Sequence, residues 1–303
     1  MIGSNDCDLE IHQYKKIQKQ ARIALEKADN FGTFPTRIDD VYEAAKIVIA
    51  DEDCLTDSFI NKFRKKAGNA LKRAIQKVTG LFHASAGVVF LDGTIQGIQR
   101  TFLKLHELGH ALLPWQRDIY AVVEDCKKTV SPEVSDLFDK EANVFATEVL
   151  FQLDHFSKQA EEMTFSIKTP IALSRKYGSS IYSAIRRYVS KSSKACAVIV
   201  IHPPEYEFGL GFTAKLRRPI VSEEFQKRFG DIVWPMIYTP DDQIGALIPV
   251  GKQRMSGIKE ICITDTNGVS HLCLAESFTQ GYQVFVLIHE IETLTRSSVV
   301  INF

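Results

Sequence analysis

The segment Leu105-His-Glu-Leu-Gly-His-Ala-Leu-Leu113 has two histidines four residues apart, and a glutamate follows the first of them. Its apolar residues recur at helical spacing and a proline ends the run, so a helix is predicted over 99–113. Residues four apart share one face of a helix, and His106 and His110 can therefore direct two imidazole nitrogens at one ion. Glu107 projects beside them, where it can reach a water molecule without binding the metal. This spacing is typical of a catalytic zinc site in which the glutamate is the general base.

The same helix is expected to be buried nearly all round, because apolar residues occupy more than one of its sides. Polar residues on such a helix require a specific reason. Gly109, in mid-helix, costs roughly 1 kcal/mol relative to alanine. That cost indicates that another backbone packs closely against the helix at this point.

A third ligand is expected on a second helix, predicted over 131–153, where Ser-Pro provides an N-cap and a proline at the first helical position. Glu141 lies within the apolar stripe of this helix. A carboxylate in such a stripe should be protonated, paired or metal-bound, so Glu141 is the predicted ligand. Asp139 and Lys140 are expected to point elsewhere. Glu148, two turns further along, is expected to be a supporting carboxylate or an exposed residue.

The two segments LHELGHALL and KEANVFATEVLF together resemble the ImmA/IrrE metallopeptidases, whose pattern is H-E-x-G-H followed by E-A-N-x-F-A and an apolar end. The resemblance covers roughly 38–156. It implies a zincin-like peptidase domain with zinc held by His106, His110 and Glu141. It also implies that the protein substrate is a helix-turn-helix transcriptional repressor, and hence a role in regulating stress responses. The chain departs from the family at 151–154, where Phe-Gln-Leu-Asp replaces an apolar-Met-Pro ending.

Two nitrogen ligands and one oxygen ligand favour Zn²⁺, although Mn²⁺ or Fe²⁺ could also bind. Proteolysis at such a site further needs a donor for the developing oxyanion. Tyr120, His155, His83 and Arg100 are all candidates, and the sequence does not choose between them. The apolar strand predicted at 86–91 could pair with an extended substrate as an edge strand.

Outside these motifs, helices are predicted at 9–29, 38–50 and 57–78 from the spacing of apolar residues and from Gly and Pro breaks. The last of these is rich in Lys and Arg, which we interpret as a solvated face, because no aromatic residues are interleaved with the charges. The segment 114–130 is expected to be a polar loop.

The second half of the chain changes in character. Residues 169–189 predict two helices around a Tyr-Gly-Ser-Ser turn, with the texture of a helix-turn-helix. From residue 195 onward, short runs of β-branched and aromatic residues alternate with Pro, Gly, Asn and Asp. The predicted class is therefore α+β, in three parts. They are a mainly helical, zincin-like peptidase domain with a small sheet (1–160), a helical hairpin (161–194) and a β-rich sensor or substrate-binding domain (195–303).

Composition limits the partners. The 303 residues include 37 Lys and Arg and 37 Asp and Glu, so a net charge of zero argues against general attraction to nucleic acid or anionic membrane. Direct DNA contact is the lesser expectation, and it would fall to Arg175, Lys176, Arg186 and Arg187. No apolar run is long enough to cross a membrane, and the first thirty residues have no signal-peptide pattern. A cytoplasmic protein with reduced cysteines is expected. The oligomeric state is not predicted.

These features predict a zinc-dependent endopeptidase, a hydrolase that cleaves a protein substrate with Glu107 as general base. The alternative is a metal-binding transcriptional regulator or DNA-binding protein without proteolysis, in which the helical pair contacts DNA. Glu107 favours the enzyme, because a purely structural zinc site needs no such carboxylate and is closed by a fourth ligand.

Overall fold

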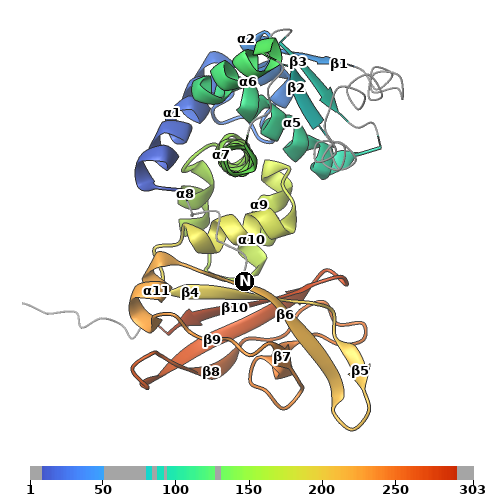
Figure 1. Cartoon of the computed structure of the whole chain (residues 1–303). Coiled ribbons are helices and arrows are strands. Elements are labelled where there is room, and N and C mark those ends of the chain that lie inside the picture. Colours follow the sequence, from blue (N-terminus) through green and yellow to red (C-terminus); the bar gives the residue numbers. More distant parts are fainter. Residues whose placement is uncertain (1–8, 51–79, 84–86, 92–93, 127–130, 292–303) are drawn as a thin grey trace, which may run out of the picture. The chain divides into compact units, whose positions relative to one another are not determined.

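The computed structural model describes residues 9–50, 80–83, 87–91, 94–126 and 131–291 (Figure 1). Within these residues the chain combines helices with parallel and antiparallel strands, which agrees with the α+β class. None of the described helices has the length and apolar character needed to cross a bilayer. The chain divides into two compact units. Among the described residues, the N-terminal unit comprises those up to Phe156 together with Ser174–Ser180, and the C-terminal unit comprises Ser157–Leu173 and 181–291.

The N-terminal unit is mainly helical. Its helices within the described residues are α1 (Ile11–Lys27), α2 (Ile38–Ala45), α5 (Gly97–Leu112), α6 (Pro114–Cys126) and α7 (Pro132–Leu150). α7 packs against both α1 and α5, so its buried face is the centre of this unit. Ser131 caps α7 as predicted, because its side chain accepts a hydrogen bond from the backbone N–H of Val134.

Three predictions for this unit can be compared with the structure. The helix predicted over 38–50 ends at Ala45, because Lys46 adopts a left-handed conformation (φ 55°) and residues 48–50 form a strand. The predicted loop at 114–130 is wrong for its first part, because α6 begins at Pro114. Proline cannot continue a helix, but it is well suited to start one. The helix predicted at 57–78 lies outside the described residues.

A small sheet of three strands belongs to the same unit. β1 (Val48–Ala50) runs parallel to β3 (Val88–Leu91), and β2 (Gly80–His83) runs antiparallel to it, in the order β1-β3-β2. The strand predicted at 86–91 is therefore the middle strand, and its expected role as an edge strand is wrong. α5 packs against β2 and β3. The outermost strand beside the histidine-bearing helix is β2.

The residues that depart from the ImmA/IrrE pattern have a structural role. Gln152 and Leu153 follow α7 with positive φ angles of 49° and 58°. The Gln152 amide donates to the backbone carbonyls of Asn30 and Thr33, and its oxygen accepts from the backbone N–H of Gly32. The polar ending of α7 thus fixes the loop that connects α1 to α2.

Three short helices follow α7, namely α8 (His155–Glu161), α9 (Lys168–Tyr177) and α10 (Ile181–Ser190). The predicted pair of helices around the Tyr-Gly-Ser-Ser turn is confirmed as α9 and α10. Arg187, one of the candidate phosphate contacts, is only 4% exposed. Lys176, another candidate, lies over the ring of Phe34 with 4.7 Å between its Nζ and the ring centroid. Neither observation favours the DNA-binding alternative.

The C-terminal unit contains the β structure expected after residue 195. Its strands form one sheet in the order β5-β6-β4-β10-β9-β8, with antiparallel neighbours, and β7 pairs with β6. The bounds are β4 Cys196–Ile201, β5 Glu205–Glu207, β6 Gly211–Val221, β7 Ile237–Tyr238, β8 Lys259–Thr264, β9 Ser270–Thr279 and β10 Val284–Glu290, with α11 at Glu223–Phe229 and a 3-10 turn at Gly245–Leu247.

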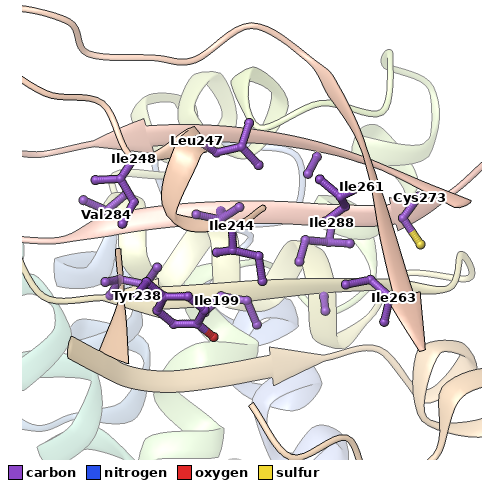
Figure 2. Close-up of a cluster of buried hydrophobic side chains, with 14 of the residues drawn as sticks. Ile199, Tyr238, Ile244, Leu247, Ile248, Ile261, Ile263, Cys273, Val284 and Ile288 are labelled. Atoms are coloured by element: carbon purple, nitrogen blue, oxygen red, sulfur yellow. The ribbon is translucent and has the colours of Figure 1, made fainter. Parts of the chain in front are cut away.

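One face of this sheet carries a compact apolar core. Figure 2 shows Ile199 of β4 and Ile288 of β10 in one apolar cluster with Leu247 of the 3-10 turn and with Ile244, which precedes that turn. β4 is buried along its whole length, because α10 contacts it and α11 packs on it as well. That double burial explains why its sequence, CAVIVI, is continuously apolar and does not alternate.

The cysteines of the β8–β9 hairpin are free thiols. Cys262 pairs in register with Leu272, whereas Cys273 pairs with Ile261. Cys262 is exposed and Cys273 is buried, so the two side chains lie on opposite faces of the hairpin and do not meet.

Candidate metal centre

α5 and α7 approach each other closely at Gly109. A Cβ atom placed on Gly109 would lie 3.0 Å from the Cα of Ala142 and 3.2 Å from its carbonyl oxygen. The expected close approach of another backbone is therefore present, and it is that of α7. Because Gly109 and Ala142 are both small, the two helices lie close enough for nearby polar side chains of each helix to meet.

Three side chains meet beside this crossing. The Nε2 atoms of His106 and His110 are 3.1 Å apart. The Oδ1 atom of Asp139 lies 3.8 Å from the first and 3.5 Å from the second. All three ligand atoms fall within 4.8 Å of one another, which makes this the group among the described residues that could hold a metal ion. The two histidines are largely buried and the side chain of Asp139 is 54% exposed, so the cluster has one side open to solvent.

The other ring nitrogen of each histidine is held by a side-chain amide. His106 Nδ1 lies 3.0 Å from Asn143 Oδ1, and His110 Nδ1 lies 2.7 Å from Gln116 Oε1. The amide nitrogen of Gln116 donates to the Phe138 carbonyl and to Glu141 Oε2, which fixes the orientation of the amide. The oxygen of Gln116 therefore accepts a hydrogen bond from His110 Nδ1. A neutral His110 then presents the lone pair of Nε2 to the cluster.

The two histidines respond differently to their surroundings. Burial and the neighbouring imidazole of His110 lower the pKa of His106 to about 4, against the effects of Asp139 and Asn143. Burial also lowers the pKa of His110, but the contacts with Asp139, Glu107 and Gln116 outweigh burial and raise it above its ordinary value. His106 is thus a neutral imidazole at pH 7.

Glu141, the predicted third ligand, lies outside this group. It is buried as expected, but its Oε2 atom accepts hydrogen bonds from Trp115 Nε1 and Gln116 Nε2, each at 2.7 Å. Asp139, expected to point elsewhere, faces the histidines instead. Residues two apart on a helix diverge by roughly 200°, whereas residues four apart share a face. Asp139 and Asn143 therefore reach the histidines together.

Glu107, the predicted general base, is buried at the same site and is 5% exposed. Its charge acts on its neighbours. It is one of the contributions that raise the pKa of His110, and after burial and Asp139 it raises the pKa of Tyr120. Glu107 is not a member of the three-residue cluster. Glu107 therefore lies near enough to His110 and Tyr120 for its charge to affect both, and its role as general base stays a prediction.

The four residues predicted as possible oxyanion donors lie in different parts of the structure. The ring of Tyr120, on α6, packs edge-on against His110 with 5.6 Å between centroids. His155 packs against Phe31, and its Nδ1 contacts the Gln152 carbonyl. Arg100 donates a hydrogen bond to the Ile95 carbonyl, and the side chain of His83 lies outside the described residues. Tyr120 is thus the candidate in contact with a histidine of the cluster.

Glu148, expected to be a supporting carboxylate or an exposed residue, is buried and away from the cluster. Its carboxylate accepts hydrogen bonds from the Tyr14 hydroxyl and the Gln18 amide of α1. Glu148 therefore ties α7 to α1.

Sequence reasoning missed Gln116 and Asn143, and it missed that Asp139 lies beside the two histidines. Two of these could have been found from spacing, because Asp139 and Asn143 are four residues apart on a predicted helix. Gln116 gives no such signal, because the sequence predicts a polar loop at 114–130.

The donor set fits a divalent transition metal. Two imidazole nitrogens and one carboxylate oxygen are the ligands that Zn²⁺ takes in open, catalytic sites. Hydrogen bonds from the remote ring nitrogens to side-chain oxygens are the usual support of such ligands. The exposed side of Asp139 leaves room for a further ligand, such as water or substrate.

No family model matches the chain, and no curated protein matches it. A Mycobacterium tuberculosis transcriptional regulator is similar in structure, with 15% sequence identity and a TM-score of 0.48. The similar region covers 91% of this chain and 76% of that one. The resemblance to the ImmA/IrrE peptidases remains a prediction, and function is inferred below from the residues of the site.

Proposed function

We propose that the chain is a zinc-dependent endopeptidase with a zincin-like N-terminal unit, in which His106, His110 and Asp139 hold the metal. The observation that carries the proposal is the 3.1 Å separation of the two histidine Nε2 atoms, with a carboxylate oxygen beside them. Lone pairs converging at this distance repel one another unless a proton or a cation lies between them. Mn²⁺ and Fe²⁺ are the alternative metals.

When bound, zinc would act as a Lewis acid toward a water molecule and toward the scissile carbonyl. The residues of this chain would supply the proton transfers. The carboxylate of Glu107 would take a proton from the attacking water and return it to the leaving nitrogen of the peptide. Its place on α5, one residue after His106, supports this role, because a general base must lie within reach of the metal-bound water. The hydroxyl group of Tyr120 would donate a hydrogen bond to the oxygen of the scissile carbonyl.

A protein substrate could bind in an extended conformation along β2. This strand is the last in the described order β1-β3-β2, and it lies against α5, the helix that carries both histidines. Backbone hydrogen bonds to an edge strand hold a peptide with little dependence on its sequence. Selection of a particular protein would then depend on other contacts. A helix-turn-helix repressor is the class to test first, as the ImmA/IrrE resemblance implies.

The test is cleavage of purified helix-turn-helix repressors by the zinc-loaded protein, with newly formed N-termini labelled and sequenced. Glu107→Gln is the informative variant, because it keeps the shape of the side chain and removes the base. We expect fragments with the native protein, none after chelation, and a loss of about 10²- to 10⁴-fold in Glu107→Gln. Zinc content should be unchanged in that variant.

Equal cleavage by native protein and Glu107→Gln would refute the role of Glu107. Stoichiometric zinc binding without cleavage of any repressor would favour the alternative, a metal-binding regulator without proteolysis. A salt-dependent affinity of the same preparation for DNA would then distinguish a DNA-binding regulator.

A further inference from the structure

Three side chains in a row lead away from His110 into the protein. His110 Nδ1 is 2.7 Å from Gln116 Oε1, and Gln116 Nε2 is 2.7 Å from Glu141 Oε2. Trp115 Nε1 donates to the same oxygen of Glu141, also at 2.7 Å. Gln116 is fully buried and Glu141 is 4% exposed, so water does not compete for these bonds.

The amide of Gln116 can sit in two orientations, and each imposes a different tautomer on His110. With the amide oxygen toward the ring, as observed, Nδ1 carries the hydrogen and Nε2 is free to bind a cation. With the amide nitrogen toward the ring, Nδ1 would have to accept, and the hydrogen would move to Nε2. In that form His110 could not bind the metal through Nε2.

We propose that Glu141 is a positioning residue that sets the tautomer of His110 by fixing the amide of Gln116. This inference rests on the proposed metal site. It gives Glu141, the third ligand predicted from the sequence, a positioning role in that site. A carboxylate only accepts hydrogen bonds, so it can be satisfied only by the nitrogen end of the Gln116 amide. The carbonyl of Phe138 accepts from the same amide nitrogen at 3.1 Å and adds to the preference.

Trp115 also favours the observed orientation of the Gln116 amide. Its indole N–H can only donate, and the bond to Glu141 holds the carboxylate oxygen where Gln116 reaches it. Trp115 and Gln116 are neighbours in the first turn of α6, so one helix start supplies both donors. The start of α6 at Pro114 is what brings this pair to α7.

The experiment compares three variants of the full chain. Glu141→Ala removes the acceptor, and Glu141→Gln keeps an amide oxygen that can still accept from Gln116. Glu148→Ala is the matched control, because Glu148 is a second buried carboxylate on α7 whose bonds go to Tyr14 and Gln18 on α1. Folding of each variant is checked by circular dichroism and thermal unfolding.

Two readouts separate positioning from general stability. The first is zinc affinity, measured by competition with a chromophoric chelator. We expect about a 10- to 100-fold loss in Glu141→Ala, the range usual for a residue that orients a metal ligand. The loss in Glu141→Gln should be much smaller, and Glu148→Ala should bind zinc as the native chain does while unfolding at a lower temperature.

The second readout is the tautomer of His110 in the metal-free protein, from long-range ¹H–¹⁵N spectra recorded at a pH at which only one ring nitrogen carries a hydrogen. The native chain should show Nδ1–H, and Glu141→Ala should shift the population toward Nε2–H. If Glu141→Ala does not fold, Gln116→Met removes the amide at similar side-chain length and takes its place.

Native zinc affinity together with the native tautomer in Glu141→Ala would overturn the relay. Equal and complete loss of zinc in Glu141→Ala and Glu141→Gln, with Nδ1–H retained in both, would also overturn it, because Glu141 would then be a ligand. If the native chain takes up no zinc, the proposed function fails separately. In that case a tautomer shift in Glu141→Ala still supports positioning, and its absence refutes it.

Discussion

Replacing Gly109 by alanine tests whether the contact between α5 and α7 sets the metal site. The added Cβ would lie 3.0 Å from Ala142 Cα and 3.2 Å from both its Cβ and its carbonyl oxygen, all closer than ordinary contacts of 3.4–4 Å. Two of these three atoms belong to the backbone, so no side chain can turn away to relieve the overlap.

Two opposing effects set the magnitude. Alanine gains about 1 kcal/mol over glycine in the middle of a helix. Overpacking a tight contact costs about 1–3 kcal/mol, and here the cost should fall in the upper part of that range because backbone must move. The net expectation is a destabilisation of about 1–2 kcal/mol, or a few degrees in Tm for a unit of this size.

Gly109→Ala should reduce zinc affinity by more, in free energy, than it reduces the stability of the fold. Moving α7 away from α5 by a few tenths of an ångström shifts Asp139 and Asn143 together, relative to both histidines. Gly257→Ala is the matched control, because a Cβ there meets nothing within 4 Å and the backbone is unstrained. Thermal unfolding and zinc competition are measured on both variants. A Gly109→Ala protein that is more stable than the native chain and binds zinc equally well would refute the reasoning.

Three further outcomes are expected. Asp139→Ala should lose zinc, as measured by elemental analysis, and unchanged zinc content would exclude Asp139 as a ligand. Tyr120→Phe should keep zinc while losing about 10²- to 10³-fold in cleavage rate, the range for one oxyanion donor; an unchanged rate would leave the donor unassigned. The hydrogen bond from His271, with backbone N–H groups of Val269 and Asn267, holds the pKa of Asp265 below its ordinary value. Because the pKa is lower in the folded state, the ionised carboxylate stabilises the fold. This stabilisation is fully present above the unfolded-state pKa and is lost as the pH falls through the folded-state pKa. The difference in urea midpoint between native and Asp265→Asn protein should therefore be present at neutral pH and vanish in acid, and a difference independent of pH would contradict this.

The helices that build the site could be predicted because their signals are local. The apolar spacing in α5 and the Ser-Pro start of α7 depend only on neighbours in sequence. The small residues at the crossing were also visible, since a glycine in mid-helix requires a partner. What these patterns do not contain is the angle at which one helix meets the other.

The arrangement of strands could not be predicted for the opposite reason. β1 and β3 are short and are separated by more than thirty residues, yet they pair in parallel. Whether a strand lies in the middle or at the edge depends on partners that its own residues do not specify. The same holds for the C-terminal unit. Its sequence predicts β structure, but it does not reveal that β4, the first strand of the sheet in the chain, pairs with β10, the last.

The different surroundings of Asp139 and Glu141 follow from the sides of α7 on which they lie. The proposed metal must keep a coordination position open to substrate, and a ligand at the rim of the apolar face is compatible with that requirement. Asp139 is half exposed and meets that condition, and Asn143 on the next turn is placed to orient His106. Glu141 lies deep in the apolar stripe, where a carboxylate can be satisfied by fixed donors such as Trp115 and Gln116. The apolar stripe therefore identifies which acid is buried, whereas the proposed ligand Asp139 lies on a neighbouring face, four residues before the hydrogen-bonding Asn143.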